Sequence, residues 1–260
     1  MCLITFAYQQ HDDYPLLLAA NRDEFYARPT RALDYWPDQP SLLAGKDLQA
    51  GGTWMGVIAR GPNTGRFAAL TNIRQLPAPD IKAPSRGELV TKVLLTAQSI
   101  PECLKAIELR GHQYQGFNLV AGDASGIWYL SNRVPGVRAL DPGVYSLSNG
   151  TLDEPWPKTT LAHQQLKDFM AEPSSVRDLA LLLSSRSRAP DEALPRTGIA
   201  LDWERALSAQ WIDIPEYGTR AQTGFLVTAQ GEAQLYEQTL LPGPGTPLPA
   251  GQQFRLPGFW

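Results

Sequence analysis

CLITFAY, residues 2–8, directly follows Met1, alternates in side-chain character and contains β-branched and aromatic residues. Such a run is typical of a β-strand. A polar turn over residues 9–14 follows, and residues 15–20 predict a second strand that returns beside the first. We expect this strand to end at NRDE, residues 21–24, so that four polar groups lie together where sites are commonly built.

The rest of the chain predicts further strands and helices in blocks. Strands are expected after the glycine-rich run at 51–56 and at residues 66–73, 116–121, 126–131, 137–140, 144–149, 221–229 and 232–240. Helices are expected at residues 85–97, where Ser85 and Glu88 have the spacing of a capping box, and at 99–111, 158–170, 175–183 and 203–208.

The short turns between neighbouring strands predict antiparallel pairing, because parallel strands need long crossover connections. The helices come in pairs between the blocks of strands, so each pair is placed to cover one face of a sheet. Two antiparallel sheets stacked face to face, with helices outside, would use all these elements. The predicted fold class is therefore α+β.

Length and composition limit the class of protein. The chain has 260 residues, 43% of them apolar, which suits a single domain over residues 1–260 with a Pro/Gly-rich tail at 242–260 that wraps the surface. The net charge is −3 and there is no basic stretch, which argues against nucleic acid as a partner. No apolar run is long enough to span a bilayer, so we expect no stable membrane insertion. Two cysteines and no secretion signal favour a cytoplasmic location.

Cys2 has the clearest chemical potential in the chain. If Met1 is removed, its thiol and a free α-amine belong to the same residue. An α-amine titrates at about 7.7–8.0, so it can accept the proton of the neighbouring thiol near neutral pH. The alternative is that Cys2 is a small apolar residue on a buried strand, as most free cysteines are.

A thiol nucleophile also needs a group that orients its amine and donors for an oxyanion. Asp23 is the best candidate for orienting the amine, and the alternative is a turn residue paired with Arg22 or Arg28. Asn72 and Asn149 both close predicted strands and could donate to an oxyanion, although Asn149 begins an Asn-Gly pair, which is common in turns.

Arg220 precedes the last predicted hairpin. It could bind a carboxylate or phosphate, or stabilise developing charge, and the alternative is a structural ion pair. Other chemistries have no support: the glycines at 51–56 lack the ending of a phosphate loop, and the chain has no G-x-S-x-G motif. The three histidines are widely separated and Cys103 is isolated, so no metal site is predicted.

Several motifs resemble one known family. The sequence NRDEFYARP at 21–29 is similar to the signature of the NRDE family, also called the transport and Golgi organisation protein 2 family. The resemblance continues in order through GGTWMG at 51–56, ALTN at 69–72, SRG at 85–87, GFNL at 116–119, YLSNR at 129–133, LSNG at 147–150, PWPK at 155–158 and YGTR at 217–220.

This family resembles the N-terminal nucleophile hydrolases of the bile-salt hydrolase and penicillin V acylase type. The resemblance implies a four-layer αββα sandwich that hydrolyses a C–N amide bond of a small acylated substrate without a cofactor. It implies that Cys2 is nucleophile and base, Asp23 orients the amine, Asn149 serves the oxyanion hole and Arg220 lies beside the nucleophile. Asn72 is a weaker match to a further site asparagine.

The residues around this set are predicted to contact the substrate, namely Asn21, Arg22, Glu24, Arg28 and Trp54. Arg22 departs from the hydrolase pattern, in which the arginine lies three residues before the aspartate; this chain has Ala20 there.

The same resemblance has a competing implication, because the NRDE family is associated with haem trafficking and with acyl-CoA or lipid metabolism. The chain would then be a non-catalytic carrier on the same scaffold. Cys2 or His163 could ligate haem iron, and Arg22, Arg28 or Arg220 could bind the phosphates of acyl-CoA.

Overall fold

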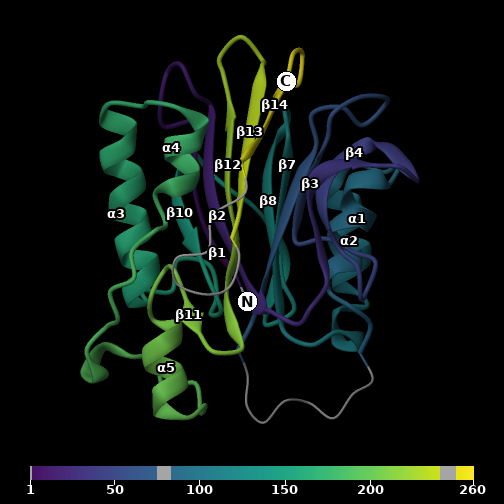
Figure 1. Ribbon diagram of the computed structural model, residues 1–260. Helices are drawn as coiled ribbons and strands as arrows, with labels where there is room; N and C mark the ends of the chain where they lie inside the picture. Colours follow the sequence, from purple (N-terminus) through teal and green to yellow (C-terminus); the bar gives the residue numbers. More distant parts are fainter. Residues whose placement is uncertain (1, 75–82, 241–249) are drawn as a thin grey trace.

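A computed structural model of the chain describes residues 2–74, 83–240 and 250–260. Within these residues, two antiparallel sheets stack face to face and helices cover their outer faces (Figure 1). The architecture is therefore the expected α+β sandwich with the layer order αββα.

The first sheet carries the N-terminal strand. Its order is β10-β1-β2-β12-β13-β14, and β11 pairs with the free part of β12. The strands are β1 (Cys2–Tyr8), β2 (Leu16–Phe25), β10 (Gly143–Leu147), β11 (Asp213–Ile214), β12 (Tyr217–Val227), β13 (Ala233–Thr239) and β14 (Gln252–Leu256).

The second sheet follows chain order, with neighbouring strands joined as β3-β4-β5-β6-β7-β8-β9. Its strands are β3 (Thr30–Trp36), β4 (Gln39–Asp47), β5 (Met55–Ile58), β6 (Phe67–Asn72), β7 (Phe117–Asp123), β8 (Gly126–Ser131) and β9 (Val134–Ala139).

The helices flank the sheets in pairs (Figure 1). Helices α1 (Gly87–Leu95) and α2 (Ile100–Glu108) pack on the second sheet, and α3 (Pro157–Ala171) and α4 (Val176–Leu181) pack on the first. Helix α5 (Leu201–Leu207) lies near β11, and short 3₁₀ helices span Gly111–Gln113 and Asp191–Ala193. None of the helices in the described ranges is long and apolar enough to cross a membrane.

Side-chain alternation along β1 explains the layers. Ile4 and Phe6 belong to the apolar cluster between the two sheets, whereas Leu3 and Ala7 belong to the cluster under α3 and α4. Successive side chains of a strand point to opposite faces, so β1, which is buried at every position, is covered on both sides. Burial of Phe6, which has no exposed surface, contributes about 2–3 kcal/mol.

The structure corrects the prediction that the second strand ends before NRDE. Strand β2 continues to Phe25, because β12 pairs with it beyond Arg22, where the pairing with β1 ends. The four polar residues therefore do not emerge together. Asn21 and Asp23 share one face of the sheet, and Arg22 and Glu24 share the other.

Three other predictions were wrong locally. Strands β3 and β4 lie where the sequence predicted no element. Ser85 does not cap α1, since Arg86 is the N-cap and Glu88 instead accepts a hydrogen bond from Tyr114 Oη at 2.5 Å. The C-terminal tail is not only a surface wrap: β14 pairs with β13, and Phe259 is buried in the core between the sheets. Residues 242–249 of the tail lie outside the described residues.

Candidate functional site

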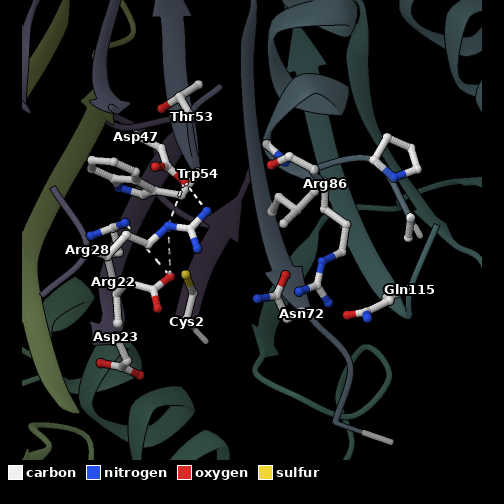
Figure 2. A pocket seen from close by; sticks show the side chains of 16 residues that line it. Cys2, Arg22, Asp23, Arg28, Asp47, Thr53, Trp54, Asn72, Arg86 and Gln115 are labelled. Carbon is white, nitrogen blue, oxygen red and sulfur yellow. Dashed lines mark hydrogen bonds and ion pairs between the residues drawn. The ribbon is translucent and has the colours of Figure 1, made fainter. Parts of the chain in front are cut away.

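A cavity of about 390 Å³ opens where β1 begins, between one end of each sheet. The first sheet contributes Cys2 and the NRDE residues Arg22, Asp23 and Glu24, and the second contributes residues around β6 and α1. Figure 2 shows Cys2 with Arg22, Arg28 and Trp54 on one side, and Arg86, Asn72 and Gln115 on the other. The cavity therefore joins segments that are far apart in the sequence.

Cys2 is held by strand pairing at the cavity wall. It lies directly opposite Arg22 in the β1–β2 register, and side chains of such pairs lie on the same face. Its main-chain oxygen accepts a hydrogen bond from Ser148 Oγ at 3.2 Å. Burial raises the pKa of the Cys2 thiol, and the main-chain N–H of Asp23 partly opposes this rise. The thiol therefore needs a nearby base to become a thiolate.

Asp23 lies on the opposite face of β2, pointing away from the arginines (Figure 2). It is 1% exposed, and its Oδ1 accepts a hydrogen bond from Thr219 Oγ1 at 2.8 Å. Burial raises the pKa of Asp23, while the positive charge of Lys158 is the neighbour that most opposes the rise. Asp23 is thus a buried carboxylate beside the start of β1, next to Arg22, which pairs with Cys2.

A network of charges lines the cavity next to Cys2. Arg28 Nη2 pairs with Asp47 Oδ2 at 2.7 Å, and Glu24 Oε2 lies 3.8 Å from Arg28 Nε and 3.9 Å from Arg22 Nη2. Burial raises the pKa of Asp47, but the hydrogen bond and charge of Arg28, together with the main-chain N–H groups of Gln49 and Ala50, outweigh burial and hold that pKa below its usual value. Arg28 and Asp47 therefore form the well-paired part of this network.

Arg22 is less well satisfied than Arg28. Its guanidinium carbon lies 4.3 Å from the centre of the Trp54 ring, which is a cation–π contact. The side chain is 5% exposed, and Nη1 has no hydrogen-bond partner among the described residues. A buried guanidinium nitrogen without a partner is costly, so this corner of the cavity suits a hydrogen-bond acceptor.

Arg86 on the far wall was not predicted as a site residue, although it lies in the SRG motif. Its Nη1 donates to the Gly116 carbonyl at 3.0 Å, and no described carboxylate forms an ion pair with it. Gly52 explains why it lies here: a Cβ on Gly52 would be 2.5 Å from the main-chain carbon of Gly87. Close backbone contact thus brings the loop that carries Trp54 against the start of α1.

The two predicted oxyanion asparagines occupy neighbouring positions with different exposure to the cavity. Asn72 lines the cavity. Asn149 does not, and its Nδ2 donates to the Asn72 main-chain oxygen at 2.8 Å. Ser148 links Asn149 to Cys2, because its hydroxyl lies 3.3 Å from Asn149 Oδ1 and also binds the Cys2 oxygen.

Asn21 and Arg220 do not line the cavity. Asn21 Nδ2 donates to the carbonyls of Leu183 and Gln210 at 2.8 and 2.9 Å on the helix-covered face. Arg220 Nη1 donates to three carbonyls of the turn after β2, those of Phe25, Tyr26 and Arg28. Asn21 and Arg220 therefore hold neighbouring segments of the chain in place. Arg220 in particular holds the turn that carries Arg28.

A second group of buried charges lies behind Asp23 and was missed by the sequence reasoning. Arg74 Nη1 pairs with Glu204 Oε2 at 2.7 Å, and both side chains are at most 6% exposed. Lys158 is 3% exposed. The PWPK motif was the signal that could have pointed to Lys158, because a lysine in the first turn of a helix is disfavoured by the helix dipole.

Comparisons with known proteins agree on one family. The family model for Transport and Golgi organisation 2 matches residues 1–242. The Transport and Golgi organization protein 2 homolog of Bos taurus is 36% identical over 93% of this chain and 94% of its own length, and that of Homo sapiens is 35% identical with the same coverage. The Drosophila melanogaster protein is 29% identical over 92% of each chain.

Among solved structures, a Caenorhabditis elegans ortholog of N-acylethanolamine-hydrolyzing acid amidase is similar, with a TM-score of 0.49 and 11% identity over 86% of this chain and 92% of that chain. The sequence matches, by contrast, span nearly the whole chain at over 30% identity. This chain belongs to the Transport and Golgi organisation 2 family.

Proposed function

We propose that the chain is a cysteine hydrolase that cleaves a C–N amide bond of a small acylated substrate after Met1 has been removed. The observation that carries the proposal is the position of Cys2: its side chain lines an open cavity at the start of a strand, with the buried Asp23 carboxylate beside it. A terminal amine, a thiol and an orienting carboxylate are the groups that self-activation of a nucleophile needs.

The proposed reaction uses two steps. The α-amine of Cys2 accepts the thiol proton, and the thiolate sulfur attacks the amide carbon to form a C–S bond. The α-ammonium, oriented by Asp23, then returns the proton to the leaving nitrogen as the C–N bond breaks. Water attacks the resulting thioester with the α-amine as base, which releases the acid and restores the thiol.

The oxyanion formed in both steps needs hydrogen-bond donors. Because Asn149 Nδ2 is already engaged with the main chain of Asn72, we assign the donor to the side chain of Asn72, which lines the cavity. Asn149 then acts by holding the Asn72 segment. Arg22, Arg28, Glu24 and Trp54 form the wall that would contact the rest of the substrate.

Loss of Met1 and reaction at Cys2 test this proposal. We expect the intact mass of the purified protein to show that Met1 is absent, and p-nitrophenyl acetate to place one acetyl group on the Cys2 peptide. The Cys2→Ala variant should release p-nitrophenol at the background rate, whereas Cys103→Ala, which changes the other free cysteine, should react like the parent protein. Complete retention of Met1, or equal reaction of Cys2→Ala, would refute the proposal.

A second candidate is a carrier of acyl-CoA on the same scaffold. The guanidinium groups of Arg22, Arg28 and Arg86 at one cavity favour it, because arginine binds phosphate strongly. Calorimetric titration of the Cys2→Ala variant with acetyl-CoA tests it. Saturable binding that is weakened at least about tenfold by Arg86→Met would support a carrier, and heats no larger than dilution would exclude it.

The residues present do not fit haem well. His163 lies in a separate hollow of about 410 Å³, together with Asp153 and Thr159. Cys2 is the thiol at the main cavity, but burial raises its pKa and so opposes the thiolate that would ligate iron. No step of the proposed reaction involves haem. Cys2 and Cys103 are both free thiols, which supports extending the proposal to a cytoplasmic location.

A further inference from the structure

Lys158 is the second residue of α3 and is 3% exposed. Lysine is seldom this deeply buried unless an opposite charge balances it. The N-terminal end of a helix carries partial positive charge, which makes the position still less favourable for a cation. A specific interaction must therefore retain Lys158 at this place.

The fold connects the start of α3 to Asp23 through one short segment. Gln210 Nε2 donates to the Lys158 carbonyl at 3.4 Å, and the Gln210 carbonyl accepts a hydrogen bond from Asn21 Nδ2 at 2.9 Å. Thr219, which binds Asp23 with its hydroxyl, also lies 3.5 Å from the Gln210 carbonyl. The start of α3 and the Asp23 carboxylate are thus joined through Gln210 and Thr219 on the helix-covered face of the first sheet.

The charges that face Lys158 come from several elements. They are Cys2 of β1, Asp23 of β2, Arg74 after β6, and Glu204 of α5. Arg74 and Glu204 neutralise each other as an ion pair at 2.7 Å. Asp23 is therefore the carboxylate whose charge balances Lys158.

The remaining neighbours of Asp23 do not replace Lys158. Burial keeps the pKa of Tyr217 well above its ordinary value, so the phenol stays neutral. Arg22 points from β2 to the opposite face of the sheet and contacts Trp54 and Glu24. Lys158 is the cation on the same side as Asp23 that has no carboxylate partner within ion-pair distance among the described residues.

We propose that Lys158 is a positioning residue of this site: its ammonium keeps Asp23 ionised, so that Asp23 can accept a hydrogen bond from the α-ammonium of Cys2. The inference rests on the proposed hydrolase function, in which that ammonium forms when the thiol loses its proton. Lys158 acts through Asp23 and needs no contact with the substrate.

The direction of the pKa shifts supports this role. Burial raises the pKa of Asp23, and Lys158 is the charge that most lowers it again. Burial lowers the pKa of Lys158 to about 8, and Asp23 is the charge that most opposes that change. Lys158 therefore remains mostly protonated at pH 7, where its charge is needed.

The pH dependence of Cys2 acetylation by p-nitrophenyl acetate tests the inference, with the acetyl group measured on the Cys2 peptide between pH 5 and 9. We expect Lys158→Met to lose about tenfold in rate at pH 6, because removing a charge beside a buried carboxylate changes its ionisation by at least that factor. The loss should shrink as the pH rises and Asp23 ionises without help. Lys158→Arg should keep the parent pH dependence, and Lys167→Met, on the exposed side of the same helix, is the matched control.

A loss in Lys158→Met that is equal at every pH, or a Lys158→Arg variant that remains folded but behaves like Lys158→Met, would overturn the inference. In the Asp23→Asn background, Lys158→Met should have no further effect, and an undiminished effect there would also overturn it. If Lys158→Met does not fold, Lys158→Gln and Lys158→Arg provide the same comparison.

Failure of the hydrolase function can be distinguished from failure of this inference. The first would leave Cys2 unreactive in the parent protein. The role of Lys158 is tested without any reaction by ¹³C NMR of the Asp23 carboxyl carbon. Its titration should move to higher pH in Lys158→Met. An unchanged titration would refute the role of Lys158 even if Cys2 reacts.

Discussion

Replacing Glu237 with glutamine should stabilise the protein, and the effect should depend on pH. Glu237 lies on β13 and is 3% exposed between the two sheets. Its Oε1 accepts a hydrogen bond from the Leu33 N–H at 2.7 Å, and Oε2 lies 3.4 Å from Thr223 Oγ1. Glutamine keeps the shape and the acceptor for Leu33 while removing the charge.

The magnitude follows from the pKa. Burial raises the pKa of Glu237 from 4.5 to about 7, and the two hydrogen bonds and the charge of Arg22 only partly oppose this. Below pH 4.5 the carboxyl is protonated in both the folded and unfolded states. Between pH 4.5 and 7 the folded state retains a proton that the unfolded state has lost, so the free energy of unfolding falls as the pH rises. Above pH 7, the ionised Glu237 carboxylate lowers the free energy of unfolding by about 3 kcal/mol in full.

Urea denaturation followed by tryptophan fluorescence at pH 5 and pH 8 measures this effect. The free energy of unfolding of Glu237→Gln should exceed that of the parent protein by about 3 kcal/mol at pH 8 and by less than about 1 kcal/mol at pH 5. Glu192→Gln, which removes an exposed carboxylate, is the control and should change little at either pH. A Glu237→Gln advantage that is the same at both pH values, or absent at pH 8, would refute the reasoning.

Two further substitutions test the packing around the site. Arg74→Met should lower the free energy of unfolding by about 3–5 kcal/mol in urea, because it leaves the Glu204 carboxylate buried without its cation; adding Glu204→Gln should recover most of the loss, and no recovery would contradict this account. Gly52→Ala should cost about 1–3 kcal/mol and lower the thermal midpoint, because the new Cβ meets the Gly87 backbone; an unchanged midpoint would show that this contact is not tight.

Much of the fold was predictable because the relevant signals are local. The alternation at residues 2–8 predicted β1 with its observed bounds, and residues 126–131 did so for β8. The helical periods predicted α1 to α4 with small errors at their ends. Strands β3 and β4 were missed because residues 30–47 mix charged, aromatic and proline residues without a clear period.

The candidate site was predictable in part. Cys2, Asp23 and Asn72 were expected from residue type and from the family resemblance, and they do line one cavity with the predicted contact residues Arg22, Glu24, Arg28 and Trp54. Asn21, Asn149 and Arg220 bind main-chain groups instead of facing that cavity. Their side chains are the same types that a site would use, so residue type does not distinguish the two roles.

The amino-acid sequence alone determined most of the segments that form strands and helices, that the strands are antiparallel, and that a thiol follows Met1. Tertiary structure alone decided that β12 extends β2 through the NRDE residues, so that Arg22 and Asp23 point to opposite faces. It also decided that Lys158, more than a hundred residues later, lies in the buried layer with Asp23. The physical reason is that periodicity depends on neighbours along the chain, whereas burial and charge balance depend on neighbours in space.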